Sequence, residues 1–153
     1  MFLYILSSAP QTAVHTINSL SGDMLWEVID AWPGERKVQF LVFVTGSARL
    51  PLPGSELLKV EAPFVALGAA EHRAHLGMLP QAHTCDNLLE LPNYWQALLH
   101  VKGYRTASAV PPELYPGLRD ECKKVLDDRL TLAITNCTGY GLDQRGGGEG
   151  DDD

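Results

Sequence analysis

Residues 79–94 read LPQAHTCDNLLELPNY, with Cys85 near the middle of the run. A loop that begins at Pro80 precedes the cysteine, and the apolar run Leu88-Leu89-Glu90-Leu91 follows it and ends at Pro92. Short apolar runs bounded by turn residues are typical of buried strands. We therefore expect a short strand over residues 87–91, with a polar, thiol-bearing loop directly before it.

The residues around Cys85 are suited to chemistry at its sulfur. A thiol reacts as the thiolate, which a nearby proton acceptor or positive charge favours. His83 is two residues away, and on an extended chain two such side chains share a face about 7 Å apart. From these residues alone two interpretations stay open: a nucleophile supported by His83, or a half-buried cysteine beside a surface histidine.

Two helices are expected upstream of this segment. A helix over residues 23–32 follows from apolar residues at i, i+3, i+4 and i+7, namely Leu25, Val28, Ile29 and Trp32. Asp23 is the expected N-cap of this helix, and the Pro33-Gly34 pair ends it. A second helix is expected to start at Pro33 and to stop at residues 45–47, Thr-Gly-Ser.

The other segments complete a mixed pattern. Residues 57–67 are strand-like, residues 72–79 are less regular, and residues 95–119 are rich in Pro and Gly and predict a long loop. A final helix is expected over residues 120–137, ended by Gly139 and Gly141. We therefore predict an α+β fold, a small mixed domain with a short central β-sheet flanked by helices.

Composition limits the classes of protein that fit. The chain has 153 residues, of which 45% are apolar and 20% charged, enough for one core. The net charge is −7, and it is −3 without the last eight residues, which hold four acids, four glycines and no apolar side chain. Because such a segment cannot pack, the Gly/Asp-rich tail over residues 143–153 is expected to be disordered. A negative chain argues against a nucleic-acid partner, and the lack of a long apolar run or a basic leader argues against membrane insertion and secretion.

Three cysteines, Cys85, Cys122 and Cys137, without a C-x-x-C pair form neither a disulfide framework nor a zinc site. This predicts a reducing, intracellular setting in the cytoplasm, the nucleus or both. His72 and His75 are spaced i, i+3, but with Glu71 as the one nearby ligand type they are interpreted as a solvated helix face. No metal and no cofactor are expected.

The segment around Cys85 resembles the active-site signature of the HECT family of E3 ubiquitin ligases, L-P-x-A-H-T-C-x-N-x-L-x-L-P-x-Y, and meets every fixed position. Two further blocks occur in the family's order. Residues 40–51, FLVFVTGSARLP, are similar to the family's F-L-Q-F-V-T-G-S-S-R-V-P, and residues 130–142 resemble its closing helix and its G-F-G-L end. The resemblance covers roughly residues 20–142.

The resemblance implies that the chain is the smaller C-lobe of a two-lobe catalytic domain, over residues 19–142. Residues 1–18 would then lie near the hinge, and the larger N-lobe, which binds the E2 conjugating enzyme, would belong to a longer parent chain. The implied partners are ubiquitin, E2 and substrate proteins. Cys85 would accept ubiquitin from E2 as a glycyl thioester and pass it to a substrate lysine.

Supporting roles follow from the same resemblance. His83 would orient or polarise Cys85, and Thr84 and Asn87 would stabilise the oxyanion, although a purely structural role for all three stays open. Asp86 stands where the family usually has an apolar residue, and it is a candidate modulator of the thiol or of the incoming lysine. The alternative that Asp86 keeps open is a non-catalytic module that binds ubiquitin or another partner.

Residues 95–119 lengthen the chain relative to the family and predict an insertion loop. Two interpretations apply to it: a tolerated surface loop, or a partner contact through the aromatic residues Trp95, Tyr104 and Tyr115. A cysteine hydrolase fits less well, because it needs a second histidine and His100 alone lies downstream of Cys85. Tyr140 is the nearest match to an aromatic residue close to the family's C-terminus, but it lies 13 residues from the end.

Overall fold

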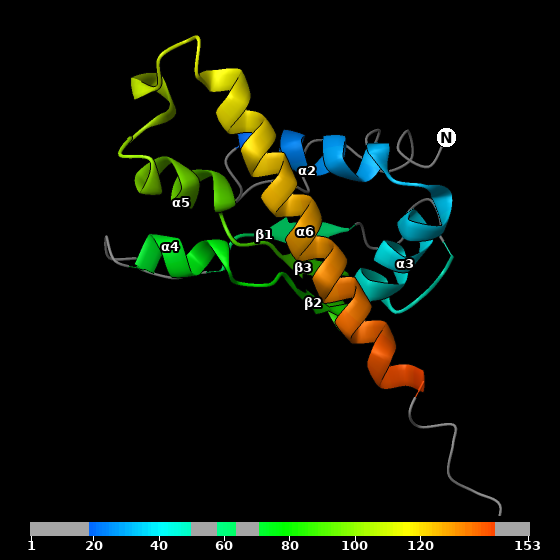
Figure 1. The fold of residues 1–153 in the computed structure, drawn as a ribbon. Coiled ribbons are helices and arrows are strands. Elements are labelled where there is room, and N and C mark those ends of the chain that lie inside the picture. The colour runs from blue at the N-terminus through cyan, green and yellow to red at the C-terminus, as the bar shows by residue number, and fades with distance from the viewer. Residues whose placement is uncertain (1–18, 50–57, 64–70, 143–153) are drawn as a thin grey trace, which may run out of the picture.

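Within the part of the chain that the structure describes, a three-stranded sheet lies among five α-helices. Figure 1 shows how these elements are arranged. The structure is a computed structural model, which describes residues 19–49, 58–63 and 71–142. The strands are β1 (Lys59–Glu61), β2 (Gln81–His83) and β3 (Leu88–Glu90), in the order β1-β3-β2. β3 runs parallel to β1 and antiparallel to β2. The structure thus confirms the α+β class and the strand that directly follows Cys85.

Side-chain alternation gives the sheet two unlike faces. Val60, Ala82 and Leu89 pair across the strands on one face, and Val60 and Leu89 are buried in the core. The neighbouring residues of each strand point to the other face, as a period of two requires, and this face carries Lys59, Glu61, Gln81, His83, Leu88 and Glu90. One face therefore builds the core and the other presents polar groups to solvent.

The first two helices of the described residues are α2 (Ser19–Ala31) and α3 (Gly34–Thr45). The expected N-cap was wrong, because α2 begins before Asp23, which lies exposed inside the helix. Three residues of capping type, Ser19, Ser21 and Asp23, stand close together, and spacing alone does not select among them. The end of α3 is confirmed: Gly46 adopts a left-handed conformation (φ 76°), and its N–H donates to the carbonyl of Val42.

Two segments expected to be irregular contain helices. Residues 71–76 form α4 (Glu71–Leu76), and the predicted loop over residues 95–119 is wrong in its secondary structure, because it contains most of α5 (Tyr94–Val101), a 3₁₀ turn and the start of the last helix. Asn93 caps α5 by accepting a hydrogen bond from the N–H of Gln96 at 3.1 Å. The many Pro and Gly residues of this stretch concealed the short helical period. That the segment is an insertion relative to the family stays a prediction.

The last helix, α6 (Tyr115–Leu142), is longer than expected at both ends. Pro116 lies in its first turn, where the missing N–H has no helical partner to lose. Gly139 and Gly141 were expected to end the helix but lie within it. Glycine in a helix costs only about 1 kcal/mol, which a helix of this length tolerates.

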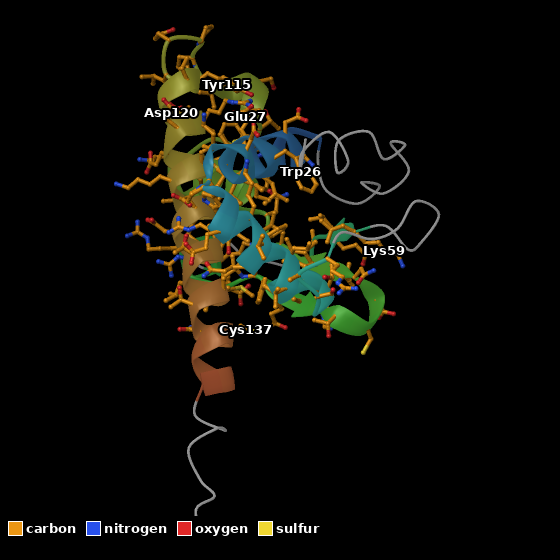
Figure 2. The ribbon with its side chains drawn as sticks, turned by 90° about the vertical axis from the view of Figure 1, so that its right-hand side faces the viewer. Trp26, Glu27, Lys59, Tyr115, Asp120 and Cys137 are labelled. Atoms are coloured by element: carbon orange, nitrogen blue, oxygen red, sulfur yellow. The ribbon has the colours of Figure 1, made fainter. Side chains whose placement is uncertain are left out.

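α6 packs against α2, α3 and α5. Trp32 Nε1 donates to Asp127 Oδ1 at 2.6 Å, and Arg119 pairs with Glu27 of α2. The final turns of α6, which carry Cys137, extend past the other elements in both views (Figures 1 and 2). No helix in the described ranges is both long and apolar enough to cross a membrane.

The fully buried core joins both sheet and helices, and its largest members are Trp95, Tyr94, Phe40, Met24, Leu25, Ile29, Leu41, Leu89, Leu91, Leu99, Leu130 and Val44. Trp95 is 1% exposed and meets Tyr115 edge-on, with 5.6 Å between ring centroids. Tyr104 is half-buried against the same core. Trp95 therefore serves the core and not a partner surface.

Candidate functional site

Cys85 lies in a 3₁₀ turn, Thr84–Asp86, that joins β2 to β3. We call residues 83–87 the Cys85 turn. It closes at Asn87, which adopts the left-handed conformation with φ 49°. Asparagine takes this conformation more readily than most residues, so its place at the end of the turn has a local physical reason.

Backbone hydrogen bonds hold the Cys85 turn to the sheet. The N–H of Asn87 reaches the carbonyl of Thr84 at 3.4 Å, and the carbonyl of Asn87 accepts the N–H of Lys59 at 2.8 Å. The second bond joins the end of the turn to β1, the strand on the far side of β3. The turn is therefore fixed by main-chain geometry that leaves its side chains available to solvent.

The C-terminus of α3 braces the Cys85 turn from the other side. α3 packs against both β2 and the turn, and a Cβ placed on Gly46 would stand 3.6 Å from Cβ of Thr84. Thr45 Oγ1 donates to the carbonyl of Leu41 at 2.7 Å and also contacts Ser47, which tightens this helix end. The segment 40–51 and the segment 79–94, matched separately in sequence, thus meet in space.

The side chains of the Cys85 turn are largely solvent-exposed. Cys85, His83, Thr84 and Asp86 are exposed, whereas Asn87 is half-buried. Leu89, two residues after the turn, is fully buried and anchors β3. The turn therefore presents a thiol from a rigid support, an arrangement suited to reaction with a large partner.

His83 pairs with Glu90 and not with the thiol. Its Nε2 lies 3.2 Å from Oε1 of Glu90, on the neighbouring strand. No hydrogen bond or ion pair within the described ranges joins His83 to Cys85. The predicted proximity of the two residues is present along the chain, but the direct contact between them is not made.

Tyr94 anchors the segment that leads into the turn. Its hydroxyl donates to the carbonyl of Met78 at 2.5 Å, and its ring is almost completely buried. Burial raises the pKa of Tyr94 well above its ordinary value, an effect that Arg129 opposes and Cys122 adds to. The hydroxyl therefore stays protonated and available as a donor at physiological pH.

The other two cysteines occupy different surroundings. Cys122 is buried in the core, and burial raises the pKa of its thiol to about 12, with Arg119 opposing and Glu121 adding to the shift. Cys137 is exposed near the end of α6 (Figure 2). Cys122 is therefore unsuited to act as a thiolate, and exposure alone does not distinguish Cys85 from Cys137.

His72 and His75 are buried, which corrects the expectation of a solvated helix face. They lie where α4 packs on α5, and the ring of His72 stacks on His100 at 4.1 Å between centroids. His100 Nδ1 is within 2.9 Å of the Gln96 carbonyl. No group of three potential metal ligands gathers among the described residues. His100 is thus engaged within α5 and α4, which argues against a hydrolytic Cys85–His100 pair.

Comparison with known proteins identifies the family to which this chain belongs. The sequence model of the family described as HECT-domain (ubiquitin-transferase) matches residues 7–99. The chain belongs to the HECT family. The human probable E3 ubiquitin-protein ligase HERC3 is 32% identical over 78% of this chain, and that match spans 8% of HERC3.

Other relatives agree with this assignment. The Drosophila melanogaster E3 ubiquitin-protein ligase Smurf1 is 37% identical over 77% of the chain, and the fission-yeast E3 ubiquitin-protein ligase pub1 is 31% identical over 76%. The matches span 9% of Smurf1 and 12% of pub1. The chain therefore corresponds to a small part of each of these HECT ligases.

Glu90 is the residue of this site that the sequence did not single out. It sits between two leucines of the apolar run, where a lone acid is easily taken for a solvent-facing strand residue. The available signal was its alternation with Leu89, which places it on the polar face that His83 shares.

Proposed function

We propose that this chain is the C-lobe of a HECT ubiquitin ligase and that Cys85 carries ubiquitin as a thioester. The observation that supports this most strongly is the position of Cys85. Its exposed thiol lies on a turn between β2 and β3, braced by Gly46 at the end of α3 and closed by the left-handed Asn87. A thiol that must reach a protein-bound thioester needs this combination of access and rigid support.

In the first step, the Cys85 thiolate attacks the carbonyl carbon of the thioester between E2 and the C-terminal glycine of ubiquitin. A new S–C bond forms on Cys85, the old one breaks, and the E2 thiolate leaves. The exchange replaces one thioester by another and is nearly isoenergetic, so that geometry and thiolate fraction set the rate. E2 would dock mainly on an N-lobe carried elsewhere in a longer chain.

In the second step, the amine of a substrate lysine attacks the same carbonyl carbon. An isopeptide N–C bond forms, the Cys85 thiolate leaves, and the amine gives up a proton. Thr84 and Asn87 are proposed to support the oxyanion of the tetrahedral intermediates through groups of the Cys85 turn. His83 and Asp86 are the ionisable neighbours of Cys85 that can influence the loss of the proton from the lysine amine.

The experiment that tests this proposal uses no E2, so its outcome does not depend on an E2-binding lobe. The chain is mixed with ubiquitin that carries a C-terminal alkyl thioester, and transfer is followed on non-reducing gels and by mass spectrometry. We expect a thioester-linked adduct that reducing agent removes. Cys85→Ala should abolish the adduct, whereas Cys137→Ala, which removes the other exposed thiol, should form it at the wild-type rate.

An adduct that maps to Cys137, or no adduct under conditions in which the same reagent acylates free cysteine, would contradict the proposal. If ubiquitin binds the chain without transfer, the non-catalytic binding module becomes the better description. Ubiquitin binding by the Cys85→Ala variant, measured by NMR titration, separates that case from a chain that does not recognise ubiquitin.

A further inference from the structure

The polar face of the sheet holds a carboxylate–imidazole pair beside Cys85. His83 is the last residue of β2, Glu90 is the last residue of β3, and His83 Nε2 lies 3.2 Å from Glu90 Oε1. In the antiparallel register His83 faces Leu88 and Gln81 faces Glu90. The pair is therefore diagonal across the two strands, at a spacing that long side chains span.

Stability does not account for this pair. The side chain of His83 is 45% exposed and that of Glu90 is 34% exposed. Ion pairs with this much solvent access contribute little to folding, because water and salt screen them. The contact instead determines the orientation of an imidazole two residues before the reactive thiol.

The chemistry of the pair determines which ring nitrogen carries the proton. An ionised carboxylate is an acceptor only, so the ring nitrogen that faces it must be the donor. With Nε2 as the N–H, the neutral ring has Nδ1 as its free acceptor, and the hydrogen bond made by one nitrogen fixes the role of the other. Glu90 thus selects the Nε2–H tautomer of His83.

We propose that Glu90 is a positioning residue that holds His83 with Nδ1 as a proton acceptor for the lysine-transfer step. This inference rests on the proposed function of Cys85. As the lysine amine attacks the thioester carbon, the N–C bond forms, the C–S bond breaks, and the Cys85 thiolate leaves. The proton lost by the amine passes to Nδ1 of His83, and the carboxylate of Glu90 stabilises the imidazolium that results.

Several other charged groups lie on or next to the elements that pack against β2, among them Arg49, which follows the end of α3. Cys85 and Asp86 follow His83 in the turn, and Glu61 and Lys59 lie on β1, beyond β3. α3, which packs on β2, has its charged residues in its first turn, at the end opposite Gly46. Glu61 lies on the same polar face as Glu90 but one strand further from His83, and it therefore provides a matched control.

The first test measures the tautomer and needs no ubiquitin. The chain is labelled with ¹⁵N, and long-range proton–nitrogen spectra report which nitrogen of His83 carries hydrogen. We expect the Nε2–H form in the wild type and in Glu61→Gln, and a mixture in Glu90→Gln, because the amide can donate as well as accept. An Nδ1–H ring in the wild type, or an unchanged spectrum in Glu90→Gln, would overturn the proposal.

The second test separates loading from discharge. Cys85 is loaded from the ubiquitin alkyl thioester, excess reagent is removed, and transfer to free lysine is timed between pH 5.5 and 9. Glu90→Gln should load normally and discharge more slowly by on the order of tenfold, a fraction of what a complete general base provides. Its pH profile should be displaced from that of the wild type, and Glu90→Asp should recover part of the rate.

A double-mutant comparison excludes a structural explanation. In a His83→Gln background, Glu90→Gln should cause no further loss, because the residue it positions is absent. Two results would contradict the positioning role of Glu90 and leave the proposed function of Cys85 intact. One is a wild-type discharge rate in Glu90→Gln, and the other is a loss of discharge rate from Glu90→Gln that is as large in the His83→Gln background as in the wild type. Failure of the wild-type chain to load ubiquitin contradicts the proposed function instead.

Discussion

The two ends of β3 have opposite characters. At its beginning, the Cys85 turn is solvent-exposed and held by backbone hydrogen bonds and a left-handed Asn87. Beyond its end, the chain enters α5, where Tyr94 and Trp95 are each 1% exposed. One end is arranged for access and the other for packing. Substitutions at the first should therefore alter transfer rates, and substitutions at the second should alter stability.

The largest effect is expected from Trp95→Ala. Trp95 is buried in the core against Tyr115, so removal of its ring should cost about 3–5 kcal/mol of unfolding free energy. Urea denaturation measures the loss, and Trp95→Phe should show a milder one. Leu114→Ala removes a large side chain that is 50% exposed and should stay within about 0.5 kcal/mol of the wild type. A loss at Trp95 as small as that at Leu114 would contradict the packing described for this end.

A smaller effect is expected at Gly46, which braces the opposite end. The added methyl group would meet Thr84 at an ordinary contact distance of 3.6 Å, so the cost comes from the left-handed backbone. Gly46→Ala should lower the unfolding free energy by about 1–2 kcal/mol. Gly34→Ala, at a glycine with nothing within 4 Å, should cause no loss. Equal stability of the two variants would show that the turn does not depend on this conformation.

The contrast between the two ends of β3 also explains which elements could be predicted from the sequence. The strand after Cys85 and the glycine end of α3 rest on local signals, an apolar run between turn residues and a Thr-Gly-Ser stop, and both are confirmed. α4 and α5 are stabilised by packing on each other, and the burial of His72 and His75 between them is a tertiary effect. Local periodicity does not contain that information.

The features of the candidate site also separate into those set by local sequence and those set by tertiary structure. The exposure of Cys85 and the position of Asn87 follow from local chain geometry that the motif encodes. The partner of His83 depends on strand register, which brings Glu90 within 3.2 Å across the hairpin. Register is a property of the folded sheet, so the sequence pointed to the neighbouring Cys85 instead.

A further, weaker effect on the unfolding free energy is expected when the pH is lowered, through His75, which is buried where α4 packs on α5. Burial, together with the nearby His72, lowers the pKa of His75 below its ordinary value of 6.5. Below pH 6.5 the unfolded chain therefore binds a proton at this residue more readily than the folded chain, and the unfolding free energy should fall. His72, Glu71 and Arg73 share α4 with His75, and the ring centroid of Tyr94 lies 6.5 Å from that of His75.

Urea unfolding at pH 7.5, 6.5 and 5.5 measures this dependence. His75→Leu places an apolar side chain that cannot bind a proton in the buried position. This variant should therefore lose less unfolding free energy than the wild type between pH 7.5 and 5.5. Identical slopes for the wild type and His75→Leu would mean that His75 is not the group through which acid acts. Loading of Cys85 at pH 7.5 should be the same in both proteins, since His75 lies outside the Cys85 turn.

The smallest effect is expected from Asp86→Ala, which changes charge but not packing at the exposed end. The exposed Asp86 carboxylate repels the negative charge on the sulfur that attacks the thioester, so its removal should speed loading of Cys85 from the ubiquitin alkyl thioester by about two- to fivefold. The gain should shrink in 1 M salt, because exposed charges are screened. Asp128→Ala removes an exposed acid from α6 and should leave the rate unchanged. Discharge to lysine, timed separately, should keep its wild-type rate, because His83 takes the amine proton. Slower discharge would assign that proton to Asp86 instead, and no change in either step would show that this departure from the family pattern is neutral.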